Sequence, residues 1–86
     1  MNIYKTEHKA EYKADGMMQI AEVLDVETKH FADYDAAMKY ANKYGCERQY
    51  GDIEDGAVIC TSKWMNDLYY GTNQTQITIT RIEVIS

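Results

Sequence analysis

Residues 31–45, FADYDAAMKYANKYG, carry the strongest local signal in the chain, and that signal is helical. Asp33 has a short side-chain acceptor suited to the N-cap, where it binds backbone N–H groups that have no partner in the first turn. Apolar residues then recur at the 3.6-residue spacing of one helix face, namely Tyr34, Ala37, Met38, Ala41 and Tyr44. Gly45 is placed to end the helix. We therefore expect one α-helix over about residues 33–44.

The segments around this helix have the composition of strands. The chain contains eight Ile, four Val and seven Thr but only two Leu, and β-branched residues suit a pleated surface. We expect strands at residues 2–9 and 57–65, a short strand and a loop over 68–76, and a last strand over about 76–85. Residues 17–27 fit either a strand or a helix face, and we favour a strand preceded by a hairpin turn at Asp15-Gly16.

This order, β-β-α-β-β-β, predicts an α+β fold in which one helix packs on a face of an antiparallel sheet. Its 86 residues suit a single domain, residues 1–86, with one modest core. If the terminal strand lies at an edge of the sheet, its unpaired backbone groups would support a homodimer.

The last strand has a change of parity. Ile77 and Ile79 share one face of a regular strand, whereas Ile82 and Val84 share the opposite face. Either a β-bulge near Thr80-Arg81 restores the register, or the two halves face different layers. We favour the bulge.

Charge and composition exclude several functions. The formal net charge of −5 argues against direct nucleic-acid binding, which needs a basic face. No stretch approaches the roughly 20 apolar residues of a membrane span, and the N-terminus has no apolar run. Two cysteines form too few disulfide bonds to stabilise a small secreted domain. We expect a protein of the reducing cytoplasm, without a membrane or a secretory leader.

Candidate catalytic groups are sparse, and we expect no enzymatic activity. Cys60 lies mid-strand and is expected to be a small buried residue. Cys46 follows a helix C-terminus, where the dipole raises the pKa of a thiol. His8 and His30 do not stand at metal-ligand spacing from either cysteine, and the acidic residues 52–55 lack the pattern of a calcium loop. We expect neither a metal nor a cofactor.

Eight tyrosines supply much of the apolar area. Tyr34 and Tyr44 are expected in the core, whereas Tyr40 falls away from the apolar stripe and is expected to be exposed in part. Adjacent Tyr69 and Tyr70 must point to opposite sides of a strand. Tyrosine gives a large contact area at a low cost in side-chain entropy, so exposed tyrosines favour a binding surface.

The acidic segment 46–56, CERQYGDIEDG, reads as a turn-rich loop and places Tyr50 among carboxylates. Glu47, Asp52, Glu54 and Asp55 could pair with arginines and lysines in a basic groove of another protein, groups that would otherwise hold phosphates. The acidic loop is therefore a candidate partner-binding surface.

The segment LYYGTNQTQITI, residues 68–79, resembles a stretch near the C-terminus of a family of small phage-encoded anti-CRISPR proteins that act on type I-E systems. The matching positions are Tyr70, Gly71, Thr72, Asn73 and Thr75. The resemblance implies a non-enzymatic inhibitor of phage or prophage origin. Such an inhibitor binds a CRISPR surveillance complex in the host cytoplasm and blocks target DNA recognition or nuclease recruitment.

The resemblance and the acidic loop together give the candidate partner-binding set, which is Tyr50, Asp52, Glu54, Asp55, Tyr69, Tyr70 and Asn73. The expected partner is a CRISPR–Cas effector subunit with a basic surface. Two alternatives stay open. One is a phage interaction module, host-takeover or regulatory, with another target. The other is a protein that sequesters a small ligand between sheet and helix.

Overall fold

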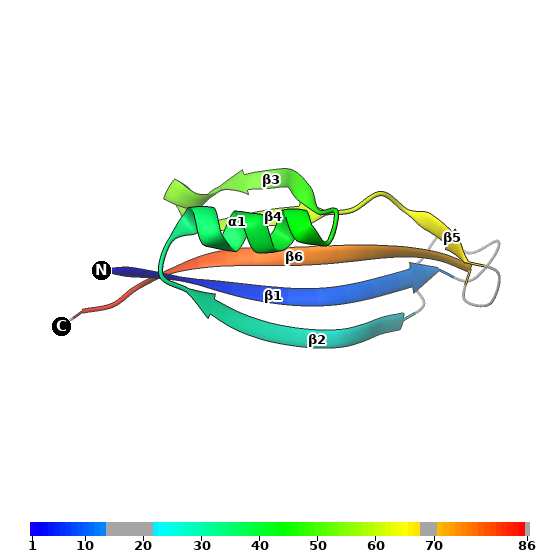
Figure 1. Ribbon diagram of the computed structural model, residues 1–86, viewed down its shortest axis with the longest axis horizontal. Coiled ribbons are helices and arrows are strands. Elements are labelled where there is room, and N and C mark those ends of the chain that lie inside the picture. The colour runs from blue at the N-terminus through cyan, green and yellow to red at the C-terminus, as the bar shows by residue number, and fades with distance from the viewer. Residues whose placement is uncertain (14–21, 68–70, 86) are drawn as a thin grey trace.

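The computed structural model describes residues 1–13, 22–67 and 71–85. Its elements follow the chain as β1 (Asn2–Lys13), β2 (Glu22–Phe31), α1 (Tyr34–Lys43), β3 (Glu47–Asp52), the short 3-10 helix η1 (Ile53–Asp55), β4 (Ala57–Thr61), β5 (Met65–Asp67) and β6 (Gly71–Glu83). The strands form an antiparallel sheet in the order β2-β1-β6-β4-β3, and β5 pairs with β6. Helix α1 lies across one face of this sheet (Figure 1). The expected α+β fold with one helix is confirmed.

Helix α1 begins and ends where the sequence predicts. The Asp33 carboxylate accepts a hydrogen bond of 2.7 Å from the backbone N–H of Ala36, as an N-cap does. At the other end Gly45 has φ +76°, and the next residue, Cys46, donates its N–H to the Ala41 carbonyl at 3.0 Å. The Ala41 carbonyl also accepts from the Tyr44 N–H at 3.1 Å, so these bonds satisfy the end of the helix and direct the chain back toward the sheet.

The core lies between α1 and the sheet. Ala37 and Ala41 are fully buried, and their small side chains let the helix approach the strands closely. Beneath them lie the buried side chains of Val58, Cys60, Ile77 and Ile79. Alternation along β4 and β6 puts these four residues on the same face, as the register of the two strands confirms.

Two tyrosines of α1 exchange the roles expected of them. Tyr40 is only 9% exposed, because its ring flanks the alanine contact and packs 5.4 Å from the Phe31 ring. Its hydroxyl is hydrogen-bonded to Nδ1 of His8 at 3.1 Å. Tyr44, expected in the core, is 41% exposed, because it is the C-cap residue and the chain turns away there. Both expectations were therefore wrong.

The expected bulge in the last strand is absent. Pairing of β6 with β1 runs without a shift from Lys13–Thr72 to Asn2–Glu83. Ile77 and Ile79 are fully buried under α1, whereas Ile82 is 37% exposed on the opposite face. The alternative, in which the two halves face different sides, is the correct one.

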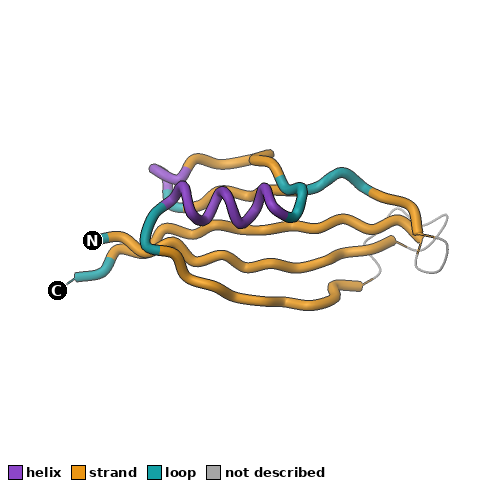
Figure 2. The backbone as a smooth tube through the Cα atoms, in the orientation of Figure 1, coloured by secondary structure: helices purple, strands orange, loops and turns teal. Residues whose placement is uncertain are grey.

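The strands after α1 differ from expectation. The acidic segment, expected to be a loop, forms β3, because its backbone pairs with β4 even though all its side chains are exposed. The strand expected over residues 57–65 is interrupted between β4 and β5 (Figure 2). Residues 71–75, expected in a loop, belong to β6. The strand expected over 17–27 is confirmed for residues 22–27, and residues 14–21, with the turn at Asp15-Gly16, lie outside the described residues.

The terminal strand is not an edge. β6 pairs with β1 on one side and with β4 and β5 on the other, so the condition set for a homodimer through its free backbone is not met. In the described part of the chain the edges belong to β2, β3 and β5.

Gly51 and Gly45 offer a matched test of the β3–β4 packing. Both have positive φ, +84° and +76°, so Gly→Ala adds about 1–2 kcal/mol of backbone strain at each. A Cβ at position 51 would also collide with the Ala57 carbonyl oxygen, whereas nothing lies within 4 Å of one at position 45. We expect Gly51→Ala to destabilise the protein by at least about 2 kcal/mol more than Gly45→Ala. Urea unfolding measures both, and equal losses would contradict the close approach at Gly51.

Candidate functional site

Four of the seven candidate partner-binding residues lie on one hairpin, formed by β3, η1 and β4. Tyr50 is 66% exposed on β3, and Asp52, Glu54 and Asp55 follow it at or beyond the strand's end, all exposed. We call these four residues the acidic hairpin. It lies near the end of the molecule that carries both termini (Figure 1).

Hydrogen bonds to the backbone hold the acidic hairpin in shape. The Asp52 carboxylate accepts from the Glu54 N–H at 3.0 Å and so caps η1. The Arg81 guanidinium, on β6, donates to the Glu54 carbonyl at 3.0 Å, and the Arg81 N–H donates to the Gly56 carbonyl at 2.8 Å. Both arginine contacts go to carbonyls, so the Glu54 and Asp55 carboxylates stay available to solvent.

The other candidate residues are elsewhere. Asn73 lies near the start of β6, at the opposite end of the strand from Arg81. It is therefore remote from the acidic hairpin (Figure 1). Tyr69 and Tyr70 lie outside the described residues. The structure thus brings Tyr50 together with three carboxylates and leaves Asn73 apart from them.

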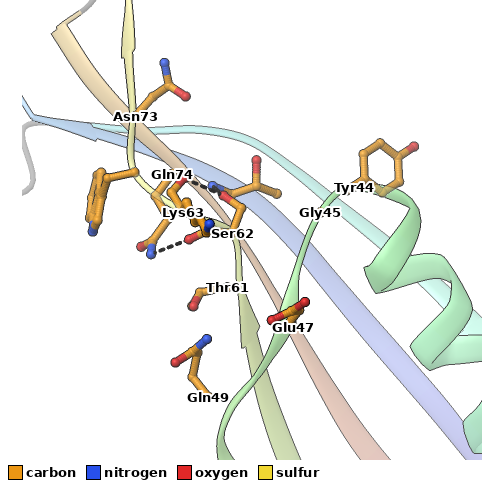
Figure 3. Close-up of a pocket in the computed structure, with 11 residues that line it drawn as sticks. Tyr44, Gly45, Glu47, Gln49, Thr61, Ser62, Lys63, Asn73 and Gln74 are labelled. Atoms are coloured by element: carbon orange, nitrogen blue, oxygen red, sulfur yellow. Dashed lines mark hydrogen bonds between the residues drawn. The ribbon is translucent and has the colours of Figure 1, made fainter.

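Asn73 lines a second feature that the sequence did not predict, a groove of about 550 Å³ at the edge of the sheet. The groove is bordered by the end of α1, the start of β3, the chain between β4 and β5, and β6 (Figure 3). Its lining residues are Tyr44, Gly45, Glu47, Gln49, Thr61, Ser62, Lys63, Trp64, Asn73, Gln74 and Thr75. We call it the edge groove.

A shift in register creates the edge groove. Thr61 pairs with Gln76 and Met65 pairs with Asn73. The chain therefore advances four residues from β4 to β5 while the paired stretch of β6 covers only three, which leaves one extra residue, as in a β-bulge. Ser62 fills the irregularity, because its N–H donates to the Thr75 carbonyl and its Oγ accepts from the Thr75 N–H, both at 2.9 Å. The Gln74 amide donates to the Ser62 carbonyl at 2.9 Å (Figure 3). The polar pair Ser62-Lys63, inside a segment expected to be one strand, is the signal that could have revealed it.

Polar side chains in the edge groove remain available for binding. Within the described residues, no hydrogen bond or ion pair is made by the side chains of Glu47, Gln49 and Asn73. The rings of Tyr44 and Trp64 border the groove, and they are 41% and 37% exposed. The groove therefore combines a carboxylate, two amides and two aromatic rings.

The two cysteines are free and fully buried. Burial raises the pKa of Cys46 from 9.0 to about 11, and the nearby Cys60 thiol adds to the shift. Burial also raises the pKa of Cys60, although Arg48 opposes this. The direction expected for Cys46 is correct, but its first cause is burial rather than the helix dipole. Neither thiol has the depressed pKa of a nucleophile.

The described residues contain no group of three His, Cys, Asp or Glu side chains placed to hold a metal ion. Among the helices that the structure describes, none combines the length and apolar character needed to cross a membrane.

The buried thiols predict a loss of stability at high pH. The unfolded chain releases the Cys46 proton near pH 9, whereas the folded chain holds it to about pH 11, so the free energy of unfolding should be steady below pH 8 and fall between these values. A two-unit difference corresponds to about 2–3 kcal/mol. Urea titrations across this range measure it. In Cys46→Ala the free energy of unfolding should fall less steeply with pH. The remaining fall comes from Cys60, Tyr34 and Tyr40, whose pKa values are also raised. An unchanged slope would show that Cys46 is not the source of the pH dependence.

No family model, curated protein or solved structure matches this chain. The acidic hairpin and the edge groove are therefore the features from which a function can be argued.

Proposed function

We propose that this protein is a phage or prophage anti-CRISPR protein. It binds a type I CRISPR surveillance complex stoichiometrically in the host cytoplasm, and it blocks either target DNA recognition or nuclease recruitment. The observation that carries this proposal is the acidic hairpin, which presents three exposed carboxylates and an exposed tyrosine. The protein acts by binding alone, without a cofactor and without contacting nucleic acid itself.

The chemistry of the acidic hairpin suits a basic protein groove. Arginines and lysines that hold phosphates form charge-assisted hydrogen bonds with carboxylates equally well. Glu54 and Asp55 offer two such carboxylates, and Tyr50 adds a large amphipathic ring beside them. A partner that binds DNA through such a groove would lose access to its target.

The rigidity of the hairpin also supports binding. Asp52 and Arg81 fix the backbone on both sides of Glu54. A surface that is already ordered loses little conformational entropy when it binds, so more of the interaction energy appears as affinity. The exposed carboxylates also speed association with a basic partner through long-range attraction.

The alternative of a sequestered small ligand finds less support. The space between α1 and the sheet, where such a pocket was expected, is filled by Ala37, Ala41 and the buried strand residues beneath them. The edge groove lies outside this space, at the rim of the sheet. A phage interaction module with another target would use the same acidic hairpin, so only the identity of the partner separates it from the proposal.

A pull-down tests the proposal directly. Tagged protein is incubated with a lysate that carries type I CRISPR machinery, and bound Cas subunits are identified by mass spectrometry. The protein should also rescue phage plating on a CRISPR-immune host. Recovery of no Cas subunit, together with no rescue, would overturn the proposal and favour another target.

Charge reversal tests the surface. We expect Glu54→Lys combined with Asp55→Lys to weaken binding to the purified complex by roughly 100-fold, because two attractions become repulsions. Asp52 is left in place because it caps η1. Glu27→Lys, on the opposite edge strand β2, is a charge reversal away from this surface that makes half the change in net charge and breaks the exposed Glu27–Lys29 ion pair; it should have little effect on binding. Calorimetric titration measures affinity, and an unchanged value for the double variant would show that binding uses another surface.

A further inference from the structure

The edge groove lies where a strand is missing from the sheet. β3 lies beside β4 and ends its pairing at Glu47–Thr61. Beyond that point the chain leaves toward α1, while β5 continues along β6. Within the described residues, no strand pairs with the outer side of residues 62–67. Such an open edge can accept an extended segment from another chain, which adds to the sheet through backbone hydrogen bonds.

The surroundings of this position favour a positive charge. Glu47 brings a carboxylate that makes no ion pair with any described residue. The C-terminal end of α1 borders the groove at Tyr44 and Gly45, and a helix C-terminus carries partial negative charge. The Tyr44 ring already contacts the Lys43 ammonium, 5.9 Å from its centroid, and the His8 ring, 4.5 Å away. Two lysines oppose this charge: exposed Lys63 belongs to the lining, and Lys43 lies beside the Tyr44 ring.

We propose that the edge groove binds an arginine side chain, carried by an extended segment of the protein partner that pairs with the open edge beside β5. This proposal rests on the proposed function, since the segment belongs to the same partner. A groove of about 550 Å³ has room for one long side chain together with part of its backbone.

The lining selects arginine over lysine. A guanidinium is planar, donates in pairs to a carboxylate and stacks on aromatic rings, whereas an ammonium is a compact and strongly hydrated charge. Glu47 offers the carboxylate, Tyr44 and Trp64 offer exposed rings, and the oxygens of the Gln49 and Asn73 amides offer further acceptors. Figure 3 shows Tyr44 at the end of α1 and Gln49 on β3, so the lining residues come from different elements.

The test uses a peptide probe and the single tryptophan of the chain, Trp64, whose fluorescence reports on the groove. Acetyl-Thr-Arg-Thr-amide is titrated against the protein, and the same peptide with citrulline in place of arginine is the neutral control of nearly equal shape. We expect saturable binding of the arginine peptide, at least about fivefold tighter than the citrulline peptide. No saturable change up to about 10 mM, or equal affinities, would overturn the proposal.

Three variants locate the charge recognition. Glu47→Gln should remove most of the difference between the two peptides, and Lys63→Gln should strengthen arginine binding by removing a like charge. Glu83→Gln removes a carboxylate outside the groove lining and should change nothing. Loss of arginine selectivity in Glu83→Gln, or its full retention in Glu47→Gln, would place the recognition elsewhere.

The peptide test and the pull-down separate the two proposals. Arginine-selective peptide binding without recovery of a Cas subunit would support the groove and overturn the proposed function. Recovery of the complex with an affinity unaffected by Glu47→Gln would support the function and overturn the groove as its contact. Reduced affinity of the complex in Glu47→Gln, but not in Glu83→Gln, would support both.

Discussion

The pairing of β6 with its neighbours is the interaction on which the rest of the structure depends. β6 pairs with β1 from Thr72 to Glu83, and its other side holds β4 and β5. Ile77 and Ile79, in its middle, are the largest fully buried side chains beneath α1. The two ends of β6 contribute to the two candidate sites. Arg81 donates a hydrogen bond to the acidic hairpin, and residues 73–75 line the edge groove. One strand therefore positions the core and both candidate sites.

What could be predicted from the sequence was set by local chemistry. The helix was located correctly because its N-cap, its alanine contact and Gly45 act within a few residues of one another. Strand β3 was missed because its residues, ERQYGD, are all exposed, so no alternation of apolar side chains marks it. Its stability comes from backbone pairing with β4, which no pattern within the segment records. The change of parity in β6 could be seen in the sequence. It does not mark a bulge, because Ile82 lies exposed on the opposite face of a regular strand.

The candidate sites divide in the same way. The acidic hairpin is contiguous in the sequence, so its charges could be recognised before the fold was known. The edge groove depends on the shift in register on β6 between its pairing with β4 and its pairing with β5. It also depends on the position at which β3 begins. Those are relations among segments far apart in the chain. Its free side chains, Glu47 and Gln49 from β3 and Asn73 from β6, come together only in three dimensions.

The two surfaces meet along one edge of the sheet. β3 runs from Glu47 in the edge groove to Asp52 at the acidic hairpin. Six residues of strand span roughly 20 Å. A standard protein interface covers about 800 Å² on each partner, which is roughly 30 Å across, so both surfaces fit within a single interface. Because β3 is paired with β4 on both sides of a register shift between Arg48 and Tyr50, and its side chains are all exposed, a partner that contacts both surfaces needs little rearrangement of this edge. We therefore expect a basic partner to approach the β3 edge rather than the face of the sheet that α1 does not cover.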